Sequence, residues 1–258
     1  MILTVDIGNT NIVLGGVRGD SIVFKARLRT DITKTSDEYC IDLKILLDVY
    51  GIGVEDVEGS IIGSVVPQVL NAMKTAIRKL TGKESLVVGP GLKTGLQLRI
   101  ENPNQAGADL VAAAVAALRT YPAPLIVVDM GTATTMTVLD SSGAMIGGCI
   151  SPGVKIALDA LTERTALLPG LQLDQPKRVI GSNTTDCMRS GVMLGAACMI
   201  DGMVDRMEAE LGRKATVVAT GGIAKFVIPM CRRPVIYDQD LLLKGLAILF
   251  RENISPRG

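Results

Sequence analysis

The chain has 258 residues, of which 48% are apolar and 3% aromatic, and its formal net charge is +1. This length suits one large domain or two small ones with an aliphatic core, and the balanced charge favours no nucleic-acid partner. The absence of histidine excludes a Ser-His-Asp triad and leaves carboxylates, hydroxyls, cations and amides for chemistry. Five widely spaced cysteines without a C-x-x-C pair favour free thiols in a reducing cytoplasm. We expect no signal peptide, because the start has no basic n-region and reaches Asp6 early. We expect no membrane partner, because no apolar run approaches the length of a membrane span.

The first half of the chain predicts strands followed by strand–helix alternation. Its strands are expected at 2–7, 12–17, 21–29, 60–66 and 86–88. Its helices are expected at 36–50, 67–80 and 108–119, with Ser36 as an N-cap and Pro67 in a first turn. The stretch 89–107 is rich in Gly, Pro, Asn and Lys, which indicates an irregular linker or a functional loop.

The second half repeats this order. Its strands are expected within 125–150 and at 216–219 and 235–237. Its helices are expected at 153–168, 184–211 and 239–250, with a further short helix after Thr220-Gly221-Gly222. This alternation predicts α/β domains in which helices flank mixed sheets. We place the two halves at 1–118 and 119–258.

A short motif ends the first strand of each half. Asp6-Ile-Gly-Asn-Thr-Asn11 returns as Asp129-Met-Gly-Thr-Ala-Thr134. One copy alone would indicate an ordinary tight turn, but two copies favour a duplicated domain. The glycines would let backbone amides approach phosphate oxygens, while Asn and Thr side chains add donors. The repeat predicts two halves facing each other across a cleft that binds nucleotide phosphates.

Two further positions each allow two interpretations. Gly221-Gly222 is either a tight strand–helix turn or a wall on which a flat base packs against the backbone. Asp109 begins a predicted helix, where it either complements the helix dipole or acts on a substrate hydroxyl. Without histidine, a base for an alcohol must be a carboxylate or a lysine.

These motifs resemble the sugar kinase/hsp70/actin superfamily, and within it the chain resembles the type III pantothenate kinases over essentially its whole length. Beyond the two Asp-x-Gly loops, the resemblance rests on Gly89-Pro-Gly-Leu-Lys-Thr-Gly95, Asn102-Pro103, Gly107-Ala-Asp109, Gly147-Gly148, Ser151-Pro-Gly153 and Gly181-x-Asn-Thr184. It implies duplicated ribonuclease-H-like (actin-like ATPase) domains with a cleft between the halves, and a cytoplasmic homodimer.

The resemblance also implies a reaction, the ATP-dependent phosphorylation of the primary hydroxyl of pantothenate to 4'-phosphopantothenate in coenzyme A biosynthesis. The ATP contacts that it implies are Asp6, Ile7, Gly8, Asn9, Thr10, Asn11, Ile12, Val13, Thr132, Gly221 and Gly222. The substrate contacts that it implies are Gly107, Ala108, Asp109, Leu110 and Thr184. Asp109 matches the general base, Asp129 matches the ligand of K⁺ or NH₄⁺, and Asp6 could hold Mg²⁺ directly or through water.

One position departs from the family pattern. The segment usually reads Gly-x-Asp-Arg, whereas Leu110 follows Asp109 here. Losing a charge-assisted partner for the pantothenate carboxylate would cost about 1.5–3 kcal/mol. Another cation could substitute (Lys93, Arg99 or Arg164), or the acceptor could be less anionic. The alternative function is an ATP-binding paralogue with weak or altered acceptor activity. A kinase for a sugar or another alcohol fits the 89–109 and 181–184 motifs less well.

Overall fold

The computed structural model describes residues 1–254 and divides into two compact units. Among the described residues, the first unit contains 1–96, 101–119 and 240–254. The second unit contains residues 97–100 and 120–239. The last helix of the chain therefore packs in the first unit. The boundary between residues 118 and 119 that is expected from the sequence would assign this helix to the second half.

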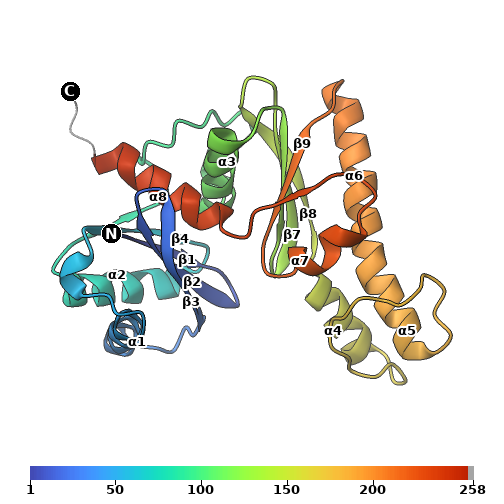
Figure 1. Ribbon diagram of the computed structural model, residues 1–258, viewed down its shortest axis with the longest axis horizontal. Coiled ribbons are helices and arrows are strands. Elements are labelled where there is room, and N and C mark those ends of the chain that lie inside the picture. Colours follow the sequence, from blue (N-terminus) through green and yellow to red (C-terminus); the bar gives the residue numbers. More distant parts are fainter. Residues whose placement is uncertain (255–258) are drawn as a thin grey trace. The chain divides into compact units, whose positions relative to one another are not determined.

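The first unit is built on a five-stranded sheet in the order β3-β2-β1-β4-β5 (Figure 1). Its strands are β1 (Ile2–Ile7), β2 (Asn11–Arg18), β3 (Ser21–Arg29), β4 (Gly59–Ser64) and β5 (Ser85–Val87). Its α-helices are α1 (Ser36–Val49), α2 (Pro67–Thr81), α3 (Ala108–Thr120) and α8 (Leu241–Ile254). Strand β1 runs antiparallel to β2 and parallel to β4, so the sheet is mixed as predicted.

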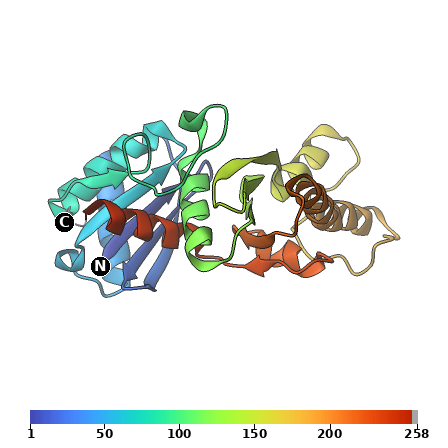
Figure 2. The ribbon, with the colours of Figure 1, turned by 90° about the horizontal axis from the view of Figure 1, so that it is seen from above.

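Side-chain alternation gives this sheet two buried faces. Leu3, Val5 and Ile7 of β1 belong to the core that α1 and α2 cover. Ile2 and Ile61 belong to a second core under α3 and α8. Figure 2 shows α3 and α8 side by side in the first unit. The sheet is thus covered by helices on both faces.

Helix α1 begins at Ser36 as predicted, but its N-cap differs from the sequence prediction by one residue. The N-cap is Thr35 rather than Ser36, because Thr35 has extended backbone and its hydroxyl accepts the Glu38 N–H at 3.3 Å. The Glu38 carboxylate in turn accepts the Thr35 N–H at 2.7 Å, which completes a capping box. Pro67 occupies the first turn of α2, as predicted.

The second unit repeats the first topology, with strand order β10-β9-β6-β7-β8. Its strands are β6 (Leu125–Met130), β7 (Ala133–Leu139), β8 (Met145–Pro152), β9 (Thr216–Thr220) and β10 (Ile236–Tyr237). Its α-helices are α4 (Val154–Arg164), α5 (Thr184–Arg189), α6 (Gly195–Leu211) and α7 (Ala224–Val227). Strand β6 pairs with β7 and β9 as β1 pairs with β2 and β4, which gives both units one plan.

Two predicted helices of this unit need correction. Helix α4 ends at Arg164 rather than residue 168, because Thr165 is extended and its hydroxyl donates to the Leu161 carbonyl. Pro169 also disfavours helical backbone at the residue before it. The predicted helix 184–211 is continuous but contains a π-helical turn, Ser190–Leu194, between α5 and α6.

The stretch Thr184–Leu211 is long enough and apolar enough to cross a membrane by length and composition alone. Core helices of globular domains share these properties. The share of its most apolar 18-residue window that lies buried inside the structure is 33%. Met193, Ala197, Ile200 and Val204 from this stretch pack into the core of the second unit. The packing gives these apolar residues a structural role against the sheet.

Candidate functional site

The first Asp-x-Gly loop joins β1 to β2 and is closed by its own backbone. The Gly8 N–H donates to the Asn11 carbonyl at 3.0 Å. The end of β3 braces the loop twice: the Thr30 N–H donates to the Thr10 carbonyl at 3.0 Å, and the Thr30 hydroxyl donates to the Gly8 carbonyl at 2.6 Å. These bonds fix the backbone amides that a phosphate group would meet.

The side chains of this loop divide into two kinds. Asn9 and Thr10 are exposed, so their polar groups reach solvent or a ligand. Ile7 and Ile12 are fully buried in the core of the unit. Any contact of these two isoleucines with a nucleotide therefore passes through their backbone atoms.

Asp6 and the start of α3 come together at one edge of the first unit. Asp6 lies opposite Gly63 in the parallel pairing of β1 with β4. A β-carbon at Gly63 would lie 3.8 Å from the Ala108 Cβ and 3.3 Å from Leu246 Cδ2. The absence of a side chain at Gly63 lets α3 begin close to Asp6. Ala108, the residue before Asp109, therefore lies close to the strand position that pairs with Asp6.

Asp109 also has a local role at the helix start. Its Oδ1 accepts the Leu110 N–H at 2.9 Å, which satisfies a backbone donor in the first turn of α3. A β-carbon at Gly107 would clash with this same carboxylate oxygen, so a larger residue there would displace the Asp109 carboxylate from its present position. The carboxylate is half-buried, which leaves part of it accessible to a substrate.

The second loop, between β6 and β7, is braced in the same way as the first. The Gly131 N–H donates to the Ala133 carbonyl at 3.0 Å, and the Gly153 N–H donates to the Thr132 carbonyl at 3.2 Å. A β-carbon at Gly153 would overlap the Thr132 carbonyl oxygen and lie 2.7 Å from that of Gly131. Glycine in the Ser151-Pro-Gly153 motif is therefore required by its close approach to the loop.

The glycine pair after β9 packs against the end of β6. Gly221 has φ +94°, in the left-handed region that favours glycine. A β-carbon there would lie 2.6 Å from the Met130 carbonyl oxygen and 2.7 Å from Asp129 Oδ1. Asp129, Gly221 and Gly222 are thereby brought together, beside the loop that carries the exposed Thr132.

Asp129 has a second neighbour that the sequence did not single out. Thr135 lies opposite Asp129 in the antiparallel pairing of β6 with β7, so their side chains share a face of the sheet. The Thr135 Oγ1 is buried and lacks a hydrogen-bond partner among the described residues. A carboxylate beside an unsatisfied hydroxyl offers an oxygen-only environment, which suits a hard cation.

Thr184 lies elsewhere in the second unit, at the exposed N-terminus of α5. It borders a cavity of about 580 Å³ between α4 and the α5–α6 stretch. The walls include Leu161, Met188 and Val192, and the polar groups on its lining come from Thr134, Ser151 and Thr184. Such a lining suits an uncharged part of a small molecule better than a triphosphate.

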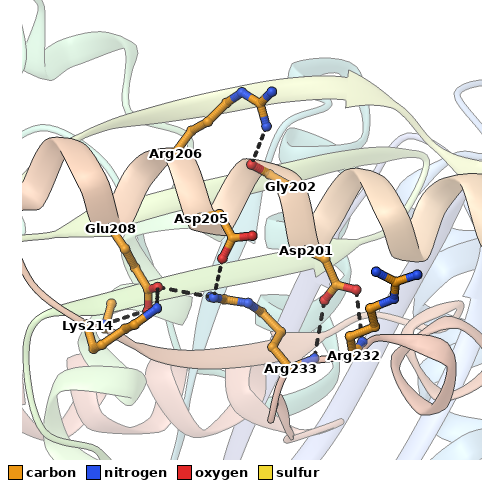
Figure 3. Close-up of polar contacts among 9 residues, drawn as sticks. Asp201, Gly202, Asp205, Arg206, Glu208, Lys214, Arg232 and Arg233 are labelled. Carbon is orange, nitrogen blue, oxygen red and sulfur yellow. Dashed lines mark hydrogen bonds and ion pairs between the residues drawn. The ribbon is translucent and has the colours of Figure 1, made fainter.

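A charged network fixes the segment that follows α7 onto α6 (Figure 3). Arg233 Nη2 donates to Glu208 Oε2 at 3.1 Å, and the same oxygen accepts from Lys214 Nζ at 2.8 Å. The other Glu208 oxygen accepts the Ala215 N–H at 3.0 Å. Burial opposes ionisation of Glu208, but these hydrogen bonds outweigh it and lower its pKa to about 2. The network holds the segment downstream of Gly221-Gly222 in place.

Of the cations considered as substitutes at residue 110, Arg99 is paired elsewhere, whereas the contacts of Lys93 are made by its backbone. Arg99 Nη1 lies 3.1 Å from Asp140, in an ion pair. The Lys93 N–H and carbonyl both bond to the Asn253 side chain, at 3.0 and 2.8 Å. Asn253 is seven residues along α8 from Leu246, which packs near Ala108, and this separation is about 10 Å along a helix. Arg164 lies at the end of α4 in the second unit.

The family model for type III pantothenate kinases matches residues 2–206. A type III pantothenate kinase of Exiguobacterium sp. is 44% identical over 253 residues, covering 98% of this chain and 99% of the relative. The chain belongs to the type III pantothenate kinase family. The resemblance inferred from the two loops and from the intervening motifs is thereby confirmed.

Solved structures of more distant proteins share the fold. The activator of the 2-hydroxyisocaproyl-CoA dehydratase from Clostridium difficile, with bound ADPNP, has a TM-score of 0.56 at 13% identity, covering 100% of this chain and 99% of that one. An inorganic polyphosphate/ATP-glucomannokinase from Arthrobacter sp. has a TM-score of 0.51 at 16% identity, covering 98% and 99%. The predicted actin-like α/β fold is confirmed.

Proposed function

We propose that this chain transfers the terminal phosphoryl group of ATP to the primary hydroxyl of pantothenate, forming 4'-phosphopantothenate, the first step of coenzyme A biosynthesis. The observation that carries the proposal is the family match along the chain, with a kinase relative of nearly equal length. The two braced Asp-x-Gly loops supply the phosphate-binding backbone that such a reaction needs.

Asp109 is the group that we assign to the acceptor hydroxyl. Phosphoryl transfer passes through a loose transition state, so positioning and charge neutralisation supply most of the acceleration. Asp109 orients the hydroxyl and accepts its proton as the new O–P bond forms, while the bond between the γ-phosphorus and the bridging oxygen breaks and ADP leaves. Its place in the first turn of α3, directly after the Ala108 that lies close to Gly63, supports this role.

Asp6 is the residue that we assign to Mg²⁺, directly or through water. Its carboxylate is a hard oxygen ligand of the kind that Mg²⁺ prefers. Bound with ATP, Mg²⁺ would neutralise phosphate charge. The exposed Asn9 and Thr10 and the amides of the first loop would orient the phosphates.

Asp129 is the residue that we assign to a monovalent cation, K⁺ or NH₄⁺. The unsatisfied Thr135 hydroxyl on the same sheet face supports this assignment, because it gains a partner when a cation binds. Gly221 and Gly222 would then form the adenosine wall next to the same strand end.

We further propose a cytoplasmic homodimer that takes the acceptor near Thr184. All five cysteines are free thiols, which agrees with a reducing compartment. Ile146, Ile150 and Ile156 expose 40%, 76% and 45% of their surface in the second unit, and apolar surface of this kind is typical of subunit interfaces. Sedimentation equilibrium at several concentrations tests the dimer, and a monomer throughout would contradict it.

The function itself is tested by incubating the purified chain with pantothenate and MgATP, with and without K⁺ or NH₄⁺. We expect a phosphorylated product by mass spectrometry and a higher rate with the cation. MgATP binding without turnover on pantothenate would favour the alternative function, an ATP-binding paralogue with altered acceptor activity. The replacement of the usual Arg by Leu110 is the observation behind that alternative.

A further inference from the structure

The first phosphate loop has no cation of its own. The segment Asp6–Val13 contains neither lysine nor arginine. Phosphate sites commonly combine backbone amides with a charged side chain, since charge-assisted hydrogen bonds are roughly twice as strong as neutral ones. A cation that serves this loop within the first unit must therefore come from a neighbouring strand or helix.

Strand β3 carries two arginines on the sheet face to which Asp6 belongs. Phe24 and Ala26 of β3 pack into the core under α1 and α2. Since side chains alternate along a strand, Arg27 and Arg29 lie on the opposite face. Val5 and Ile7 of β1 share the core face with Phe24, so Asp6 lies on the face of the two arginines.

Arg29 is the arginine adjacent to the loop. It lies directly opposite Asn11 in the antiparallel pairing of β2 with β3. Opposed residues in such a pair have Cβ atoms about 4.5–5.5 Å apart, a gap that a long side chain spans. The next residue, Thr30, makes the two hydrogen bonds that brace the loop at Thr10 and Gly8. The backbone that carries Arg29 is thus fixed relative to the phosphate-binding amides.

Arg29 is exposed and forms no ion pair within 4 Å in the described part of the chain. Lys25, on the same face of β3, is instead paired with Asp240 at 2.5 Å. The nearest acid in sequence, Asp31, directs Oδ1 to the Thr33 hydroxyl and N–H at 2.6 and 2.9 Å. The hydrogen bonds from Thr33 are the main cause of the lowered pKa of Asp31, and Arg29 contributes only weakly to it, so the Arg29 guanidinium remains available to an anionic ligand.

We propose that Arg29 contacts a phosphate oxygen of the nucleotide held by the first loop. This inference rests on the proposed function, because it deepens the ATP site. The second unit has no matching cation: the residue opposite Thr134, which corresponds to Asn11, is Ser151. The cationic side chain that contacts the phosphates is thereby assigned to the first of the two duplicated loops, in addition to Mg²⁺.

The test compares binding of MgATP and of adenosine by isothermal titration calorimetry. For Arg29→Gln we expect MgATP binding to weaken about 10- to 100-fold, which is the loss of one charge-assisted hydrogen bond. Adenosine has no phosphate, so its affinity should not change, which also shows that the variant is folded. Arg29→Lys, which keeps the charge, should recover part of the MgATP affinity.

The matched control is Arg18→Gln, an identical charge change at the opposite end of the β2–β3 hairpin. There Arg18 lies opposite Ser21 in the strand register. It should leave MgATP affinity unchanged. Equal MgATP affinity of the wild-type chain and Arg29→Gln would overturn the inference while the proposed kinase function stands. Equal losses in Arg29→Gln and Arg18→Gln would also overturn it, because a general charge effect would then explain them. A wild-type chain that binds no MgATP would contradict the proposed function itself.

Discussion

Gly221 packs against Asp129 so closely that no larger residue fits: a β-carbon at Gly221 would lie 2.7 Å from Asp129 Oδ1. Its φ of +94° adds conformational strain for any other residue. This contact joins the candidate adenosine wall to the candidate cation ligand within the second unit. Changes at Gly221 should therefore affect both.

Gly221→Ala should lower the free energy of unfolding by about 1–3 kcal/mol and weaken ATP binding, because the methyl group displaces Asp129 or the strand end. Urea denaturation and nucleotide titration measure the two effects. Gly170→Ala is the matched control, since nothing lies within 4 Å of a β-carbon at Gly170. If Gly221→Ala behaves like this control, the packing described for Gly221 is wrong.

Glu208→Gln should destabilise the chain in a pH-dependent way. The pKa of Glu208 is about 2 when folded against an ordinary value of 4.5, so its ionised form stabilises the fold above pH 4.5. This contribution, at most about 3 kcal/mol, is lost as the pH falls from about 5 to about 2. The difference in urea midpoint between wild type and variant should shrink over that range.

The control for this series is Glu210→Gln, a change at an exposed glutamate on the same helix. Its urea midpoint should follow the wild-type pH dependence. A Glu208→Gln deficit that stays constant from pH 7 to pH 3 would show that ionisation of Glu208 is not the source of the stability.

Thr135→Val should reduce activation by K⁺ or NH₄⁺ without lowering stability. The change replaces a buried hydroxyl that lacks a described partner by a methyl group, so no protein hydrogen bond is lost. The cation concentration for half-maximal activity should rise by about 10-fold if the hydroxyl is one of its ligands. Thr135→Ser keeps the oxygen and should retain wild-type cation dependence. Identical cation responses in all three proteins would remove Thr135 from the cation site.

Leu110→Arg should lower the KM for pantothenate. The residue is half-buried at the start of α3, next to Asp109, so a longer cationic side chain has access to solvent and substrate. A new charge-assisted contact with the pantothenate carboxylate would lower KM by about 10-fold. The KM for ATP should stay unchanged. Leu110→Met controls for side-chain shape, and an equal effect of both substitutions would contradict an electrostatic cause.

Much of the fold could be predicted from the sequence because it depends on local patterns. The β-branched runs and glycine turns predicted β1 and β3 at their observed bounds. Pro67 and the apolar spacing predicted α2 nearly to its end. The N-cap of α1 was displaced by one residue, since Thr35 and Ser36 are both good caps and only the Glu38 contact decides between them.

The remaining features depend on contacts between distant residues. The packing of α8 in the first unit needs Leu246 to meet Gly63, and no local pattern encodes that pairing. The roles proposed for Thr135 and Arg29 follow from strand register, which places Thr135 opposite Asp129 and Arg29 opposite Asn11. The site residues found by resemblance were already marked by motifs, whereas these two carry no motif. Predicting which residues of β7 and β3 pair with the two loop motifs could have identified them from the sequence.

The most direct test of the account is the turnover of Asp109→Asn on pantothenate, measured together with its Kd for MgATP. We expect kcat to fall by about 100-fold or more, because the amide cannot accept the hydroxyl proton. The Kd for MgATP should stay close to the wild-type value, since the first loop and the Gly221 wall are unchanged. A kcat near that of the wild type would contradict the assignment of Asp109 and, with it, the proposed mechanism.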